Sequence, residues 1–164
     1  VMDYSKIRNG GLRAIDLDEN DELIRVKLTD NTQDIIIATH DGYAIRFNET
    51  EVRSTGRTTR GVMGIRLHDG DYVIGASVAL PDSQLLTVTE NGYGKKTPLD
   101  EYRIQSRGGH GVINYNTDKY GKVAAIKSVD LDDDIILISN DGVIIRIEAN
   151  SIRICSRTSP IRER

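Results

Sequence analysis

The sequence predicts an all-β fold in which units of about four short antiparallel strands repeat about every 50 residues, in the manner of propeller blades. Three observations lead to this prediction. An Asp-Gly or Asn-Gly pair recurs at positions 41–42, 91–92 and 141–142, and the 50-residue spacing has no gap. The same register carries a glycine at Gly11, Gly61 and Gly111. No segment shows a convincing helical period, whereas stretches rich in Ile, Leu and Val precede each pair.

Each repeat is expected to begin with a buried strand, because a stretch of strand length rich in Ile, Leu and Val occurs at residues 34–39, 84–89 and 134–139. The Asp-Gly or Asn-Gly pair that follows is a strong hairpin signal, since both residues tolerate positive φ. The return strands are then expected at residues 43–47, 93–97 and 143–147.

A polar corner follows each return strand, and an extended stretch that bears arginines comes next. After the register glycine we expect a further strand, as at residues 62–67. A turn at residues 68–71 leads into a strand at residues 72–80, which closes the unit. This order divides one domain of residues 1–164 into a partial unit, two units and another partial unit, at 1–32, 33–81, 82–131 and 132–164. We interpret the chain as a fragment of a longer array, whose cut ends should expose unpaired strand edges.

The charge alternates along the chain every half repeat, although the net charge is only −3. Residues 43–66 carry a balance of +3 and residues 93–116 a balance of +2, whereas residues 67–92 carry −4 and residues 117–142 carry −3. If equivalent positions face the same way, one rim of the array is basic and its partner is a polyanion. The acidic residues Asp69, Asp71 and Asp132–Asp134 are expected to lie away from that rim.

The cations occupy fixed registers of the repeat. Arginines stand at 53, 103 and 153 and again at 57, 107 and 157, and a cation stands at 46, 96 and 146. This regularity favours phosphate contacts over a merely solvated strand edge. The candidate phosphate-binding residues are Arg46, Arg53, Arg57, Arg60, Lys95, Lys96, Arg103, Arg107, Arg146, Arg153 and Arg157.

The most distinctive segment consists of Gln105, Ser106, Arg107, Gly108, Gly109, His110 and Gly111. Its glycines allow the backbone to approach a phosphate closely, and Arg107 supplies a forked donor. A Gly-rich corner between strands is the structural alternative. In the third copy of this register, Pro160 and Ile161 stand where glycine is expected.

Several segments resemble the C-terminal domain of the DNA gyrase A subunit, and the match recurs in every repeat. The segments are residues 51–57, 61–67, 91–99 and 105–111. The resemblance implies a β-pinwheel, a propeller-like ring of six blades whose basic rim wraps DNA, of which this chain holds about three. Residues 105–111 are similar to the signature heptad Gln-Arg-Arg-Gly-Gly-Lys-Gly, but Ser106 and His110 replace two cations. A degenerate copy in a later blade fits this pattern better than the signature box itself.

By resemblance, the chain is a non-catalytic DNA-binding and DNA-wrapping part of a type IIA topoisomerase that supports negative supercoiling. The implied partners are double-stranded DNA, the gyrase B subunit, which joins an A2B2 holoenzyme, and the remainder of the gyrase A subunit. ATP and Mg²⁺ act elsewhere in that holoenzyme, so no cofactor is expected here. The implied location is the cytoplasm of a bacterium, at the nucleoid, and the single cysteine, Cys155, fits a reducing compartment.

No motif of a catalytic or metal site is recognised. The acidic stretch 132–134 lacks the spaced ligands of a Ca²⁺ loop, so it is interpreted as a turn. No stretch of 18 apolar residues occurs, so no membrane partner is expected. Two other functions remain open: the C-terminal domain of a topoisomerase IV subunit, and a propeller that serves as a protein-interaction scaffold.

Overall fold

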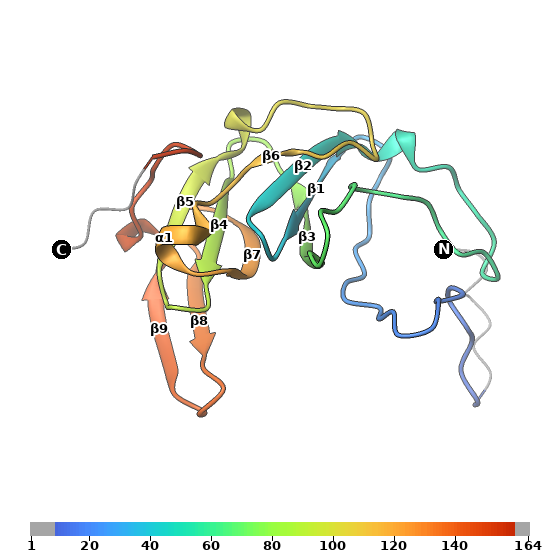
Figure 1. The fold of residues 1–164 in the computed structure, drawn as a ribbon, viewed down its shortest axis with the longest axis horizontal. Coiled ribbons are helices and arrows are strands. Elements are labelled where there is room, and N and C mark those ends of the chain that lie inside the picture. The colour runs from blue at the N-terminus through green and yellow to red at the C-terminus, as the bar shows by residue number, and fades with distance from the viewer. Residues whose placement is uncertain (1–8, 160–164) are drawn as a thin grey trace.

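The structure is a computed structural model that describes residues 9–159. Its strands and helical turns repeat with the period of the sequence (Figure 1). The first repeat contains β1 (Asp34–Thr39), β2 (Tyr43–Asn48), the 3₁₀ turn η2 (Glu49–Glu51) and β3 (Val73–Ala79). The second contains β4 (Gln84–Thr89), β5 (Gly94–Pro98), η3 (Leu99–Glu101), β6 (Val112–Ile113), α1 (Thr117–Tyr120) and β7 (Val123–Val129). The third contains β8 (Asp134–Ile138), β9 (Ile144–Glu148) and η4 (Ala149–Ser151). The predicted all-β fold is confirmed.

The hairpins form where the sequence places them, because each Asp-Gly or Asn-Gly pair supplies a residue with positive φ. Gly42, Gly92 and Gly142 have φ values of 88°, 81° and 80°. In the first hairpin, Ile37 is opposite Ile45. In the third, Leu137 is opposite Ile145. The repeat therefore preserves the strand register as well as the turn.

The fourth strand of the first sheet comes from the next repeat. The strand order in that sheet is β3-β1-β2-β6, and β6 pairs antiparallel with β2. Gly111, just before β6, is essential to this crossing because its φ is +75° and a Cβ there would lie 2.4 Å from the Ala44 carbonyl oxygen. Adjacent blades are thus joined by strand exchange and not by surface contact alone.

The expected strand at residues 62–67 is wrong, since no strand forms there. Its counterpart 50 residues later is β6, which needs the edge of the preceding β2 as its partner. Residues 9–159 hold no strand one repeat before β2 that could serve as this partner. The same reasoning applies to Leu23, Ile24, Val26 and Leu28, the register of β3, which are 47–79% exposed and form no strand.

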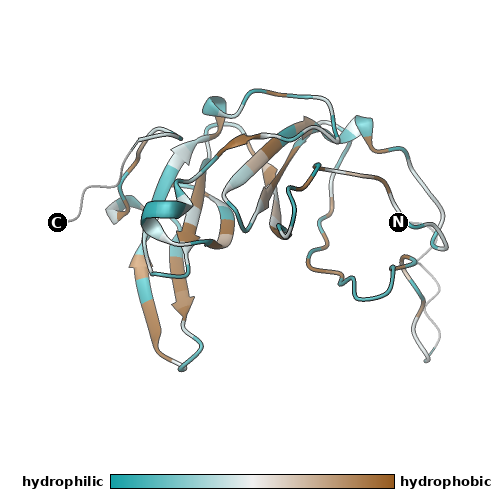
Figure 2. Cartoon of the chain, in the orientation of Figure 1, coloured by the Kyte–Doolittle hydropathy of each residue, from teal (hydrophilic) through white to brown (hydrophobic). Residues whose placement is uncertain are grey.

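The main hydrophobic core lies between the first and second sheets. It includes Ile36 and Ala44 from the first sheet and Leu85 and Val123 from the second, all 0% exposed. Their sheets are joined face to face, as the contacts between β3 and β7 also show. The equivalent face of the third hairpin has no covering sheet among residues 9–159 (Figure 2). Ile136, Ile138 and Ile144 on this hairpin are 62–68% exposed.

The three sheets follow one another along an arc (Figure 1). The hairpin turns after β1 and β4 lie toward one side of that arc, and the 3₁₀ corners lie toward its convex side. Within the described residues, no helix has the length and apolar character that a membrane crossing would require. Pro160 and Ile161, where the third copy of the glycine register fails, lie outside the described residues.

Candidate nucleic-acid interface

The arginine-bearing segments of the second and third repeats lie along the edge of the preceding blade. Ile104 forms a parallel bridge with Arg46 on β2, and Ile154 forms the same bridge with Lys96 on β5. The Gln105 N–H donates to the Arg46 carbonyl at 2.8 Å, and the Cys155 N–H donates to the Lys96 carbonyl at 2.8 Å. The segments therefore run from blade to blade in one register along the same edge.

Arg53, Arg103 and Arg153 hold equivalent positions and are exposed. Each comes two residues after a 3₁₀ corner, whose last turn closes through a backbone hydrogen bond to Val52, Tyr102 or Ile152. The corner fixes the backbone from which each of these three side chains extends. Within the described residues, none of the three guanidinium groups has a hydrogen bond or ion pair. This column is the part of the candidate set best placed to meet an external anion.

Arg107 and Arg157 are held by the protein itself. The Arg107 guanidinium donates to the Met63 carbonyl, and the Arg157 guanidinium donates to the Ile113 carbonyl. Their backbone N–H groups donate to Glu51 and Glu101, each at 2.8 Å. The two sets are 50 residues apart, so this arrangement belongs to the repeat and ties each arginine loop to the preceding corner.

Arg46 and Arg146 form ion pairs across their hairpins. Arg46 lies 2.8 Å from Asp34 and also donates to the Leu99 carbonyl of the next repeat at 2.7 Å. The side chains of Arg46 and Asp34 are 20% and 11% exposed, whereas those of Arg146 and Asp134 are 72% and 43% exposed. Part of the positive charge that the sequence suggested for DNA is thus neutralised within each of these two hairpins.

Lys95 and Lys96 are buried, with 2% and 0% exposure. Lys95 donates to the carbonyls of Ser156 and Arg157, and its ammonium lies 5.0 Å from the centre of the Tyr115 ring. Burial lowers the pKa of Lys95 to about 8 and also lowers the pKa of Lys96. Neither ammonium group is at the surface, so neither lysine can contact a phosphate directly in this structure.

The second repeat replaces the buried ion pair by two polar groups. Lys96 stands at the register of Arg46, and Gln84 stands at the register of Asp34. The Lys96 ammonium and the Gln84 side-chain oxygen are both buried without a hydrogen-bond partner in the described chain. The sequence comparison of the repeats shows this exchange, but it does not reveal that the lysine becomes buried.

The remaining candidates lie in the loops. Arg57 is half-buried, and Arg60 is exposed in an ion pair with Asp18 at 3.2 Å. The segment 105–111 packs beside residues 63–66, where the Gly108 N–H donates to the Gly64 carbonyl at 2.7 Å. His110, at the place of a signature cation, is exposed and stacks against His68 with ring centres 5.3 Å apart.

The acidic residues are divided between the two ends of the blades. Asp71 lies at the hairpin end, where its carboxylate accepts the Asp41 N–H at 2.9 Å. Asp133 lies at the corner end, since its carbonyl accepts the Ala149 N–H at 2.8 Å. The expectation that residues 132–134 lie far from the arginine rim is therefore wrong, because the turn into β8 and the corner after β9 meet at the same edge of the hairpin.

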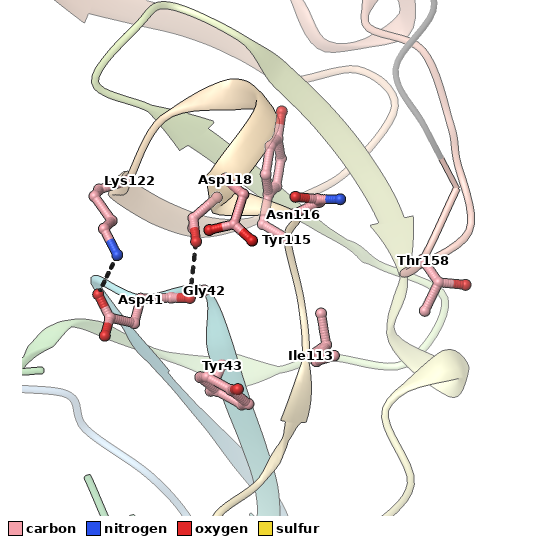
Figure 3. A pocket seen from close by; sticks show the side chains of 10 residues that line it. Asp41, Gly42, Tyr43, Ile113, Tyr115, Asn116, Asp118, Lys122 and Thr158 are labelled. Atoms are coloured by element: carbon pink, nitrogen blue, oxygen red, sulfur yellow. Dashed lines mark hydrogen bonds and ion pairs between the residues drawn. The ribbon is translucent and has the colours of Figure 1, made fainter. Parts of the chain in front are cut away.

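A cavity of about 440 Å³ opens between the first hairpin and α1 (Figure 3). Its lining includes the carboxylates Asp41 and Asp118, the ammonium of Lys122, and the rings of Tyr43 and Tyr115. Its lining also includes Ile113 and Thr158, beside Arg157, but the mixed charge of the lining does not suit a polyanion. The chemistry that the arginine column offers is binding of an extended anion.

Comparisons with known proteins agree with this architecture. The chain matches the family described as DNA gyrase C-terminal domain, beta-propeller, over residues 3–30, 33–79, 83–130 and 133–159. It is 44% identical over 155 residues to the DNA gyrase A subunit of Staphylococcus epidermidis (strain ATCC 12228 / FDA PCI 1200), covering 93% of this chain and 17% of that protein. It is also 44% identical over 163 residues to the DNA gyrase A subunit of Haloquadratum walsbyi, covering 97% of this chain and 19% of that protein.

Solved structures show the same fold. The C-terminal domain of DNA topoisomerase IV superimposes with a TM-score of 0.88 at 28% identity, covering 94% of this chain and 49% of that chain. A DNA gyrase A C-terminal domain superimposes with a TM-score of 0.84 at 30% identity, covering 90% of this chain and 51% of that chain. The chain spans less than a fifth of the curated relatives, 17–19% of their length. The β-pinwheel repeats and the family match together show that this chain belongs to the DNA gyrase C-terminal domain family.

Proposed function

We propose that this chain binds duplex DNA along the exposed arginine column and helps to bend it, without itself catalysing a reaction. The observation that supports the proposal is the equivalence of the segments at 103–105 and 153–155, which cover successive blade edges in one register. Arg53, Arg103 and Arg153 are exposed at this register. A cation repeated on successive blades of an arc suits the regular spacing of phosphates on a curved duplex.

Binding of this kind is driven by phosphate neutralisation and release of counterions. Bending 20–30 base pairs by 40–90° costs on the order of 1–6 kcal/mol, so contacts from several blades are needed to offset it. Because arginine–phosphate contacts carry no base information, affinity should depend little on DNA sequence.

The relatives extend the proposal to the whole protein. Both curated relatives are DNA gyrase A subunits. We therefore place the chain in a type IIA topoisomerase, where wrapping would give strand passage a direction and support ATP-dependent negative supercoiling. Its partners would be the gyrase B subunit, in an A2B2 holoenzyme, together with the rest of the gyrase A subunit. That holoenzyme would act in the cytoplasm of a bacterial cell, at the nucleoid. ATP and Mg²⁺ would act outside this chain.

A topoisomerase IV subunit is the second candidate. The likeness to the C-terminal domain of that enzyme, with a TM-score of 0.88, favours it. The incomplete heptad, with Ser106 and His110 in place of cations, supports the same alternative. Topological assays of the protein that carries the chain separate the two, since only the gyrase assignment predicts introduction of negative supercoils.

The salt dependence of DNA binding tests the proposal directly. The triple variant Arg53→Ala, Arg103→Ala, Arg153→Ala should flatten the slope of log affinity against log salt by about 2.7, or about 0.9 per lost contact. The matched control Arg25→Ala, Lys27→Ala, Lys127→Ala removes the same charge from exposed sites outside the column and should change the slope much less. An unchanged slope in the folded column variant would reject DNA binding at this column and favour the protein scaffold.

A further inference from the structure

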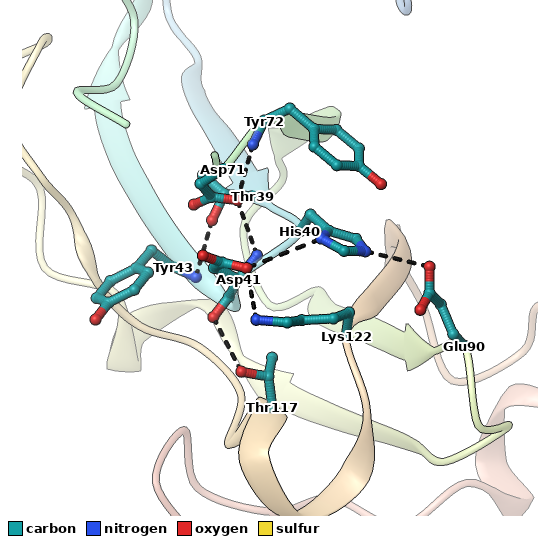
Figure 4. Close-up of polar contacts among 9 residues, drawn as sticks. All are labelled: Thr39, His40, Asp41, Tyr43, Asp71, Tyr72, Glu90, Thr117 and Lys122. Atoms are coloured by element: carbon teal, nitrogen blue, oxygen red, sulfur yellow. Dashed lines mark hydrogen bonds and ion pairs between the residues drawn. The ribbon is translucent and has the colours of Figure 1, made fainter. Parts of the chain in front are cut away.

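We propose that His40, Asp41 and Asp71 form a binding site for one divalent transition-metal ion at the junction of the first two blades. One nitrogen of His40 and one carboxylate oxygen from each aspartate lie within 4.8 Å of one another. Figure 4 shows the three side chains converging at the end of the β1–β2 hairpin. The sequence does not reveal this group, because Asp71 comes from the loop before β3, 30 residues after Asp41.

The carboxylate of Asp71 supplies an independent indication of a missing ligand. One of its oxygens accepts the N–H groups of Asp41 and Tyr72 at 2.9 and 2.8 Å. The other oxygen, Oδ2, is buried and has no hydrogen-bond partner among the described residues, and the residue is only 9% exposed. A buried carboxylate oxygen left unpaired is costly, so a cation at this point would remove an existing penalty.

The second ring nitrogen of His40 has the environment of a metal-bound imidazole. His40 Nε2 lies 3.2 Å from the Glu90 carboxylate, which orients the ring and favours a proton on Nε2. The lone pair of Nδ1 then faces Asp41 Oδ1 at 3.9 Å, and neither atom can donate to the other. The Tyr72 ring stacks on His40 with centres 4.5 Å apart and fixes the ring plane.

The local charge also favours a cation. The cluster and its surroundings hold the three carboxylates of Asp41, Asp71 and Glu90 against the single ammonium of Lys122. Lys122 lies 2.7 Å from Asp41 Oδ1, so part of the site is already filled by a positive group. A metal ion would displace this ammonium toward the adjoining cavity, whose lining includes Lys122 and Asp41 (Figure 3).

The donor set indicates the class of ion. One imidazole with two carboxylates suits Zn²⁺, Co²⁺ or Mn²⁺, whereas Ca²⁺ and Mg²⁺ prefer oxygen alone. Ligands at about 2.0–2.1 Å from one tetrahedral Zn²⁺ ion lie about 3.3–3.4 Å apart. The three side chains, whose ligand atoms lie within 4.8 Å of one another, must therefore close by up to about 1.5 Å around the ion. Binding would tie the first hairpin more firmly to the Glu90 turn of the second blade.

Titration of the full chain with Zn²⁺ by calorimetry, and with Co²⁺ by visible absorption, tests the site without reference to DNA. We expect one ion per chain, loss of binding in His40→Asn and a weakening of about 10–100-fold in Glu90→Gln, which removes the partner of the ring. Lys122→Met should bind more tightly, because the competing ammonium is gone. The controls His68→Asn and Lys127→Met should match the parent chain, and circular dichroism should show that all variants are folded.

Three results would overturn the proposal. They are retention of Zn²⁺ binding in His40→Asn, loss of binding in His68→Asn instead, and absence of binding at millimolar Zn²⁺ in both the parent chain and Lys122→Met. The gain expected in Lys122→Met does not depend on a destabilising substitution, so a folding defect in another variant leaves the test intact.

Discussion

The Glu51 carboxylate accepts a hydrogen bond of 2.8 Å from the backbone N–H of Arg107, a residue of the following repeat. Glu101 makes the same contact with Arg157 at the same distance. Each glutamate is the last residue of a 3₁₀ corner, and the guanidinium of each arginine donates a hydrogen bond to a backbone carbonyl. The contact therefore links the corner of one repeat to the arginine loop of the next and sets the position of the column between them.

This link predicts a measurable loss of stability. Glu51→Ala and Glu101→Ala should each lower the free energy of unfolding by about 1 kcal/mol, the usual contribution of a hydrogen bond of this kind. Urea unfolding followed by circular dichroism measures the change. Asp100→Ala is the matched control, because Asp100 is an exposed neighbour in the same corner. Equal losses in Asp100→Ala and Glu101→Ala would show that the corner tolerates either change without using the link.

The two Arg–Asp pairs of the hairpins provide a comparison of buried and exposed ion pairs in the same geometry. Asp34→Ala should cost about 3 kcal/mol, because it leaves the largely buried Arg46 without its partner. Asp134→Ala should cost less than about 1 kcal/mol, because the Arg146 pair is exposed to solvent. Chemical denaturation of both variants measures the difference. Similar losses would show that burial does not set the contribution of these two ion pairs.

The hairpins and the repeat could be predicted from the sequence because their signals are local. The Asp-Gly and Asn-Gly pairs place β1, β4 and β8 within about one residue of where they form. The strand exchange could not be predicted, since the two residues of β6 pair with a strand about 70 positions earlier. The burial of Lys96 was also hidden, because its register holds exposed Arg146 in the third repeat. Lys95 stands at the register of Ile45 and Ile145, so the repeat did contain a signal for its burial.

The buried lysine predicts an unusual pH dependence. Burial lowers the pKa of Lys95 to about 8 in the folded chain, below its ordinary value of 10.5. Between pH 8 and 10 the unfolded chain therefore holds the proton that the folded chain has lost, so the free energy of unfolding rises with pH. Burial raises the pKa values of Tyr102 and Tyr115, so the free energy should fall again above pH 10.

Lys95→Met isolates the lysine contribution. The rise between pH 8 and 10 should shrink in this variant to the part that Lys96 contributes, while the fall above pH 10 remains. Denaturation at a series of pH values, with Lys127→Met as an exposed control, measures both limbs. A rise of the same size in Lys95→Met would show that other groups produce it.

Gly111 and Gly92 allow the strand exchange to be tested. Both have positive φ, +75° and +81°, so alanine is strained at either position. A Cβ at Gly92 meets nothing within 4 Å, and Gly92→Ala should cost about 1 kcal/mol. A Cβ at Gly111 would lie 2.4 Å from the Ala44 carbonyl oxygen, so Gly111→Ala should cost several kcal/mol and detach β6 from β2. Amide exchange at Val112 and Asn114, whose backbone pairs with Ala44 and Gly42 at the β2–β6 edge, reports the detachment, and equal protection in the two variants would contradict it.

Arg103 and Arg107 are four positions apart, but only Arg103 has a guanidinium without a partner among the described residues. Arg103 is exposed at the blade edge, whereas the Arg107 guanidinium is bonded to the Met63 carbonyl. Arg103→Gln should reduce the slope of log DNA affinity against log salt by about 0.9, with little change in stability. Arg107→Gln should lower the free energy of unfolding by about 1 kcal/mol and leave the slope nearly unchanged, because no phosphate contact is lost.

Both substitutions remove one positive charge, so each serves as the other's control for net charge. A slope that falls equally in both variants would show that Arg107 leaves the Met63 carbonyl to bind phosphate. The column at Arg57, Arg107 and Arg157 would then belong to the DNA surface as well.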